Sequence, residues 1–117
     1  DKNKLGEYKN KLVTEDVVIT DERINHIKTQ HPNIFEKYIQ SLSDFIEKPN
    51  YILRDKKNVD TLLILKRIDS FNENIQIIIK LQIKNEENKA NTILTFWKIR
   101  DRNYNSTIKN NEIIYKI

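Results

Sequence analysis

The apolar residues of this sequence change their spacing at Pro49. Before this proline they recur every three or four residues, which is the repeat of one face of an α-helix. The members of this apolar stripe are Ile34, Tyr38, Leu42, Phe45 and Ile46. After Pro49 apolar residues recur every second residue in several short runs, which is the repeat of a β-strand. The sequence therefore predicts helices followed by strands, the pattern of an α+β fold.

Two helices are expected before Pro49. The first begins where Thr20 or Asp21 can cap a helix. It ends before His31, because Pro32 disfavours a helical conformation at the residue that precedes it. The second helix starts just after Pro32, carries the apolar stripe and ends at Pro49.

Short strands account for most of the remaining sequence. We expect them at residues 17–20, 51–53, 61–68, 75–83, 92–100 and 112–117. Residues 101–107 are expected as a polar loop. Residues 1–16 alternate charges without an apolar repeat, so we expect a tail or a remnant of upstream sequence.

The expected architecture is a single domain over residues 17–117, which suits the length of the chain. Two N-terminal helices would pack on one face of a four- to five-stranded antiparallel sheet. The opposite face of the sheet would then be available to a ligand.

The positive charge of the chain is concentrated in its second half. The formal net charge is +4, and all of this excess lies in residues 61–117. A basic half attracts polyanions, because neutralised phosphates release counterions; a solvated surface with a modest lysine bias is the alternative interpretation. The chain has no cysteine, which excludes disulfides and thiolate metal sites. No apolar run approaches the roughly 20 residues that span a bilayer.

The two histidines, His26 and His31, are the first candidates for catalysis. Two imidazoles can act as general base and general acid near neutral pH. RNA cleavage needs such a pair, one group to take the ribose 2′-OH proton and one to protonate the departing 5′-oxygen. On a continuous helix the two rings would point about 140° apart, so they converge only if the helix stops before His31. The alternative is a surface histidine followed by one that interacts with the helix C-terminus.

A zinc site is another use of two histidines. Glu22 lies one helical turn before His26 and could be a third ligand. The spacing is not that of the H-E-x-x-H motif, and no cysteine completes a tetrahedron. We therefore expect no metal and no other cofactor.

The strands add a cation, a hydroxyl and an aromatic ring. If the odd-numbered residues of 75–83 face the helices, and Leu94 and Phe96 do likewise, then Lys80, Thr95 and Trp97 share the open face. There Lys80 could stabilise the charge on the phosphate, Thr95 could donate a hydrogen bond, and Trp97 could stack on a base. The alternative interpretations are that Lys80 is only solvated, that Thr95 reflects the β-propensity of threonine, and that Trp97 belongs to the core.

Several other polar residues are candidates for substrate binding. These candidates are Lys66, Trp97, Lys98, Arg100, Tyr104, Asn105 and Tyr115. Lys98 is expected on the opposite side of the sheet from Lys80. The basic and polar segment after Arg100 could contact RNA or could be a solvated turn.

The runs ITDERINHIKTQHP, KPNYIL, TLLILKRI, IIIKLQI, NTILTFWKI and EIIYKI resemble the phage-type barnase/EndoU/colicin/RelE-like nuclease domains. The resemblance covers residues 17–117. These are small α+β modules of prophages and of the C-termini of bacterial polymorphic or contact-dependent toxins. The resemblance implies a ribonuclease without a metal, with His26 and His31 in its helical histidine region and Thr95 on its late strand. Lys80 matches its sheet cation weakly, and Lys66 competes for that position.

The predicted function is a toxin-type, metal-independent endoribonuclease that leaves a 2′,3′-cyclic phosphate, with tRNA as one candidate target. The alternative is a non-catalytic RNA- or protein-binding module of phage origin. The resemblance also implies a cognate immunity protein, and we expect a monomer. We further expect a secreted or delivered fragment that acts in the cytoplasm of a target bacterium, or alternatively a cytoplasmic phage protein.

Overall fold

A computed structural model describes residues 10–14, 17–81 and 91–117. Helices precede most of the strands, as predicted, and additional elements lie near both ends of the chain. Their bounds are β1 Asn10–Thr14, β2 Val17–Thr20, α2 Asp21–Gln30, α3 Pro32–Tyr38, η1 Ile39–Ser41, α4 Leu42–Glu47, β3 Tyr51–Arg54, β4 Thr61–Ile68, η2 Asp69–Phe71, β5 Glu73–Lys80, β6 Asn91–Ile99, α5 Asp101–Asn110 and β7 Glu112–Lys116.

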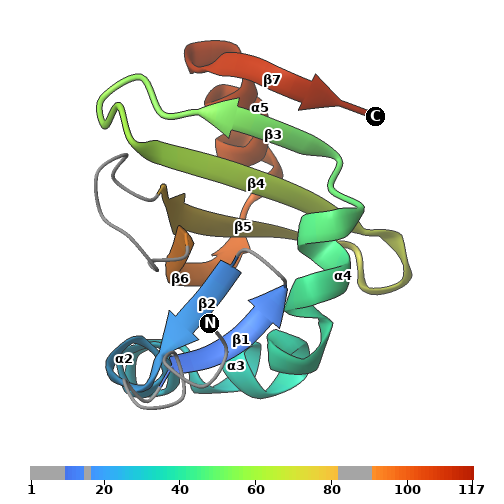
Figure 1. Ribbon diagram of the computed structural model, residues 1–117. Helices are drawn as coiled ribbons and strands as arrows, with labels where there is room; N and C mark the ends of the chain where they lie inside the picture. Colours follow the sequence, from blue (N-terminus) through green and yellow to red (C-terminus); the bar gives the residue numbers. More distant parts are fainter. Residues whose placement is uncertain (1–9, 15–16, 82–90) are drawn as a thin grey trace.

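One seven-stranded sheet organises the molecule, in the order β1-β2-β6-β5-β4-β3-β7 (Figure 1). Neighbouring strands are antiparallel except for β2 and β6, which run parallel. The parallel pairing joins Val17 to Asn91 and Val18 to Thr92 and does not continue along β6. Among the described residues, β6 therefore has no partner strand on its outer edge beyond Thr92.

Helix α2 begins and ends where the sequence predicts. The Thr20 side chain accepts a hydrogen bond from the Arg23 backbone N–H at 3.2 Å, which caps the first turn. The helix ends at Gln30, and His31 leaves it with φ −140° and ψ 61°. Pro32 then occupies the first turn of α3, where its missing N–H costs nothing.

The segment predicted as one helix after Pro32 is divided into α3, η1 and α4. The backbone at Tyr38 departs from helical geometry, with φ −119°. Phe35, Tyr38, Leu42 and Phe45 are nevertheless all buried on the same side. The apolar stripe is thus preserved through a change of helix type, because a 3₁₀ turn also keeps i and i+3 neighbours together.

The first hydrophobic core lies between α2–α4 and one face of the sheet, the helix face. Ile64, Ile77 and Phe96 are cross-strand neighbours on β4, β5 and β6, and each is at most 2% exposed. Ile27 of α2 and Phe35 of α3 pack against them. Full burial of each such side chain contributes about 1.5–3 kcal/mol, so this core anchors the helices to the sheet.

Helix α5 packs on the opposite face, which we call the α5 face. Tyr104 and Ile108 of α5 lie against a second core that contains Leu53, Leu63, Leu65 and Ile99. The prediction of a polar loop over residues 101–107 was therefore wrong, and the second face is covered in part. The helix has few apolar residues, and partial burial of Tyr104 and Ile108 against the second core holds it in place.

The expected sheet of four to five antiparallel strands was also wrong in size and in pairing. Residues 10–14, expected within a tail, form β1 and pair with β2, while β2 adds the parallel pair with β6. The expected strand 75–83 ends at Lys80, and residues 82–83 lie outside the described part of the chain. The α+β class itself is confirmed. No helix within the described ranges is long and apolar enough to cross a membrane.

Candidate functional site

The junction between α2 and α3 places His31 beside β6. Both helices pack next to this strand. The centroid of the exposed His31 imidazole lies 6.2 Å from that of the Trp97 ring, with the planes inclined by 30°. Trp97 belongs to the part of β6 that has no outer partner strand among the described residues, so an imidazole can reach it around the edge of the sheet. Pro32, which ends α2, is the local cause of this arrangement.

Trp97 connects this edge to the α5 face. It lies opposite Gln76 of β5, and it packs against the second core. Its ring is partly exposed, whereas Gln76 is only 8% exposed. The tryptophan is therefore partly a core residue, and the same ring also lies next to His31.

Thr95 and Lys80 lie on the α5 face, away from α2–α4, as the strand alternation predicts. Thr95 pairs with Ile78, and Lys80 pairs with Thr92 of β6 and Thr61 of β4. Lys80 is exposed at the end of β5 and makes no ion pair with any described residue. Thr95 and Trp97 are two residues apart on one strand, about 7 Å. The structure thus places a cation, a hydroxyl and an aromatic ring on one face.

The expected inward position of Leu94 was wrong. Ile93 and Phe96 are fully buried, whereas Leu94 is only partly buried. The pairing of β5 with β6 shifts between Ile78 and Ile79, so β6 carries one extra residue there. Such a bulge changes which residues face the core and is not visible in a simple alternation.

His26 lies on the exposed side of α2. Ile27 is the fully buried residue of this helix, and successive residues are rotated by about 100°. Within the described part of the chain, no hydrogen bond, ion pair or ring contact joins His26 to His31. The structure thus brings His31, but not His26, into contact with the residues of β6.

Lys66 of β4 and Lys98 of β6 lie on the helix face. Each pairs with Ile75 of the strand between them, β5. The Lys66 ammonium donates a hydrogen bond to the Lys48 carbonyl oxygen at 2.6 Å. The Lys98 ammonium lies 3.4 Å from a carboxylate oxygen of Glu73. The structure therefore separates these two candidates from Lys80 and Thr95.

Glu73 is the centre of a polar cluster that the sequence analysis missed. Its carboxylate accepts hydrogen bonds from the Tyr38 hydroxyl and, at 2.9 Å, from the Lys37 ammonium. These hydrogen bonds, with help from Lys98, lower the pKa of Glu73 from 4.5 to about 2. Burial, together with the neighbouring carboxylate, raises the pKa of Tyr38. The cluster connects α3 to β5 and β6. In the sequence it was indicated only by Glu73, an acidic residue at a strand position that points towards the helices.

The remaining substrate-binding candidates lie in several places. Arg100 precedes α5 and its carbonyl accepts the Tyr104 N–H at 2.9 Å, while Asn105 is exposed on that helix. Tyr104 packs edge-on against Tyr51 at 6.1 Å, and its burial raises its pKa. Tyr115 lies on the outermost strand β7 opposite Ile52, on the helix face. Tyr115 is therefore on the other face from Trp97, whereas Tyr104 packs against the same second core as Trp97.

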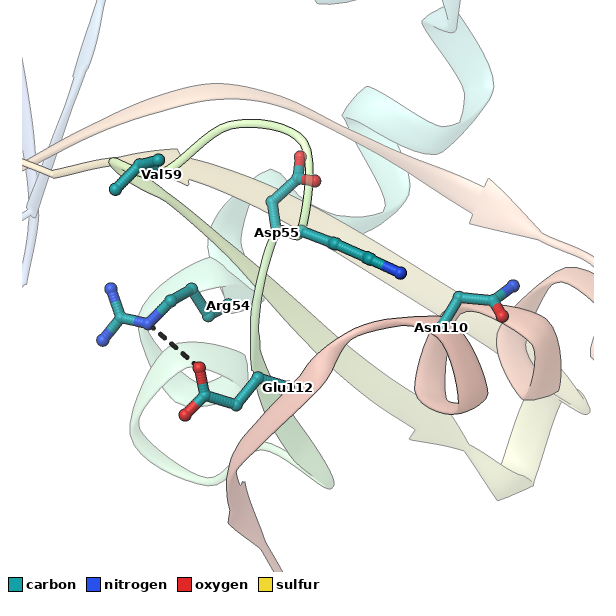
Figure 2. Close-up of a pocket in the computed structure, with 6 residues that line it drawn as sticks. Arg54, Asp55, Val59, Asn110 and Glu112 are labelled. Atoms are coloured by element: carbon teal, nitrogen blue, oxygen red, sulfur yellow. Dashed lines mark ion pairs between the residues drawn. The ribbon is translucent and has the colours of Figure 1, made fainter.

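A hollow that the sequence did not reveal lies between the β3–β4 turn and the end of α5. It has a volume of about 350 Å³. Figure 2 shows Arg54 and Glu112 on one side of it and Asn110 of α5 on the other, with Asp55 above. An adjoining hollow of about 590 Å³ is lined by Lys56 and Lys57 of the turn. Across the described residues, no group of three or more His, Cys, Asp or Glu side chains could hold a metal ion.

A comparison with known protein families gives one match. The family model described as phage-Barnase-EndoU-ColicinE5/D-RelE like nuclease3 matches residues 2–106 of the chain. No curated protein and no solved structure matches the chain significantly. The match confirms the resemblance noted in the sequence and indicates a nuclease domain, whose substrate is a nucleic acid.

Proposed function

This chain belongs to that nuclease family, and from this premise we propose that it is a metal-independent endoribonuclease. The observation that carries the proposal is the position of the His31 imidazole, whose centroid lies 6.2 Å from that of the Trp97 ring, on the edge of β6 where no described strand pairs. Thr95 and Lys80 lie on the same face of the sheet as Trp97. An imidazole, a hydroxyl, an ammonium and an aromatic ring are together the groups that metal-free RNA cleavage uses.

In the proposed reaction an imidazole takes the proton of the ribose 2′-OH, and the 2′-oxygen attacks the adjacent phosphorus. The P–O bond to the 5′-oxygen breaks, and a protonated imidazole gives that oxygen its proton. We assign His31 to one of these two proton transfers and leave the other unassigned, because the structure does not bring His26 to β6. The product strand then ends in a 2′,3′-cyclic phosphate.

The residues of the strands stabilise and orient the substrate in this proposal. Lys80 faces the non-bridging oxygens of the phosphate, where negative charge increases in the transition state. Thr95 donates a hydrogen bond to a phosphate oxygen. The exposed part of Trp97 stacks on a base next to the cleaved bond.

The chemistry of the RNA ends tests this proposal. Purified protein should cleave total RNA in the presence of EDTA, with a bell-shaped dependence of rate on pH between about 5 and 8. Mass spectrometry of the fragments should find 2′,3′-cyclic phosphates. Intact RNA under all these conditions, or fragments with 3′-hydroxyl ends, would overturn the proposed mechanism. Binding of RNA without turnover, insensitive to His31→Ala, would instead indicate a binding module.

We extend the proposal to a biological role as a toxin that acts on RNA in the cytoplasm of a target bacterium. Its target class would be tRNA, and a cognate immunity protein would block the α5 face. Expression in a bacterial cell should then arrest growth and shorten the tRNA pool, and His31→Ala should restore growth. Growth arrest with intact tRNA would exclude this target.

A further inference from the structure

The hollow beside the β3–β4 turn lies near one end of the sheet. The turn joins Arg54 to Thr61, and Thr61 is the β4 residue that pairs with Lys80. The backbone N–H of Leu81, directly after Lys80, donates to the Asp60 carbonyl at 2.7 Å. The turn and Lys80 therefore lie at the same end of the sheet.

Short hydrogen bonds hold the turn in one conformation. The Asp55 carboxylate accepts from the Lys57 backbone N–H at 2.9 Å and from the Asn58 amide at 3.1 Å. The Lys56 backbone N–H donates to the Asn111 side-chain oxygen at 2.8 Å, which fastens the turn to the end of α5. A fixed turn loses little conformational entropy when it binds a ligand.

The acids that line the hollow have partners, whereas the two lysines of the turn form no close ion pair within the described part of the chain, although the charge of Lys57 acts on Asp55. Glu112 lies 3.5 Å from Arg54, as the dashed line in Figure 2 shows, and Asp55 is occupied within the turn. The ammonium groups of Lys56 and Lys57 are exposed and form no ion pair with a described residue. The turn thus presents two adjacent ammonium groups at the same end of the sheet as Lys80, together with the carboxylates of Asp55 and Asp60.

We propose that Lys56 and Lys57 form a subsite for the backbone of a single-stranded RNA, some nucleotides away from the cleaved bond. The inference rests on the proposed function and adds a substrate class: RNA strands long enough to reach from Thr95 and Lys80 to the turn. The two exposed ammonium groups complement phosphate, and the turn lies at the same end of the sheet as Lys80. Asn110, exposed across the hollow, donates its side-chain N–H to the Ser106 hydroxyl at 3.1 Å and offers its amide oxygen to a base or a sugar.

Substrate length is the variable that tests the subsite. Two RNAs are compared, a dinucleotide with the cleaved bond and a 12-nucleotide single strand with the same bond. Lys56→Ala/Lys57→Ala should lower kcat/KM about tenfold on the long RNA and leave the dinucleotide unchanged. Because each phosphate contact of a single strand adds about 0.7 to the salt slope, the double variant should lower that slope by about 1.4.

The matched control removes the same charge elsewhere. Lys48→Ala/Lys116→Ala changes two exposed lysines that do not line the hollow, so its kcat/KM should match the wild type on both RNAs. The subsite proposal would be overturned if Lys56→Ala/Lys57→Ala lowered kcat/KM equally on both RNAs. It would also be overturned if the two double variants lowered kcat/KM equally. Asp60→Asn should raise affinity for the long RNA about twofold, because Asp60 is an exposed acid of this turn whose carboxylate has no partner among the described residues.

A binding measurement separates failure of the subsite from failure of the proposed function. A 12-nucleotide RNA with 2′-O-methyl riboses cannot be cleaved by 2′-OH attack, and its affinity is measured by fluorescence anisotropy. Lys56→Ala/Lys57→Ala should raise its Kd about tenfold while Lys48→Ala/Lys116→Ala leaves the Kd unchanged. An unchanged Kd in both double variants overturns the subsite even if the wild type cleaves RNA. If Lys56→Ala/Lys57→Ala raises the Kd and the wild type does not cleave RNA, the subsite is supported and the catalytic proposal is overturned.

Discussion

Lysines on the two faces of the same sheet have different surroundings. On the helix face, Lys66 reaches the Lys48 carbonyl and Lys98 lies beside the Glu73 carboxylate. On the α5 face, Lys80 is exposed and makes no ion pair with a described residue. All three lysines lie on strands in which apolar and polar residues alternate. The local sequence pattern therefore does not show which lysine has a partner.

The difference indicates which cations serve the fold and which are available to a ligand. A lysine that already neutralises a carboxylate has little attraction left for a phosphate, and its loss costs stability. A lysine without a partner contributes little to stability and can approach a phosphate without first breaking a contact. The following predictions test whether this division between the two faces holds.

The largest effect is expected at His31. His31→Ala should lower the rate of RNA cleavage by about 10²–10⁴-fold, because a general acid or base is lost. Thermal unfolding should change little, since the imidazole is exposed. Gln30→Ala, an exposed neighbour at the end of α2, serves as the control and should retain activity. Equal activity in both variants would remove His31 from the reaction and leave the α5 face without its assigned function.

Lys80→Ala should lower cleavage about 100-fold, because the negative charge of the transition state loses its counter-charge. Its free energy of unfolding should stay within about 0.5 kcal/mol of the wild type. Rates under single-turnover conditions and urea unfolding provide the two readings. A stability loss above 1 kcal/mol with unchanged activity would break the comparison, because Lys80 would then behave as a helix-face lysine.

Glu73→Gln should destabilise the fold by about 1–3 kcal/mol at pH 7, since Lys37 and Lys98 lose their carboxylate. The pKa of Glu73 is lowered from 4.5 to about 2. The stabilisation by the ionised carboxylate is therefore fully present above about pH 4.5 and is lost as the pH falls towards 2. Urea unfolding at pH 7 and pH 3 should show a smaller difference between wild type and variant at pH 3. A difference that does not depend on pH would contradict the assigned charge of Glu73.

The smallest effects are expected for Lys66→Ala and Lys98→Ala. Each removes one polar contact on the helix face and should cost about 0.5–1 kcal/mol of stability. Cleavage of RNA by either variant should stay within about twofold of the wild type when both are folded. A 100-fold loss of cleavage in Lys66→Ala would move the sheet cation from Lys80 to the competing position.

Local rules were sufficient for much of the fold and for part of the candidate site. A proline restricts the residue before it, so the end of α2 at Gln30 and the departure of His31 from the helix could be predicted. Alternation along β5 and β6 assigned Lys80, Thr95 and Trp97 to one face, because successive strand residues point to opposite sides. Family membership also followed from the sequence.

Contacts between distant segments decided the rest. Helix α5 is held by partial burial of Tyr104 and Ile108 against strands that are far away in sequence. This contact cannot be predicted from the helix segment alone. The approach of His31 to Trp97 depends on where the pairing of β2 with β6 stops, and the positions of Lys66 and Lys98 depend on which carbonyl or carboxylate lies beside them. The sequence specifies the chemical groups and their local direction. Whether a polar side chain has a partner within the protein or stays accessible to a ligand depends on how separate elements pack together.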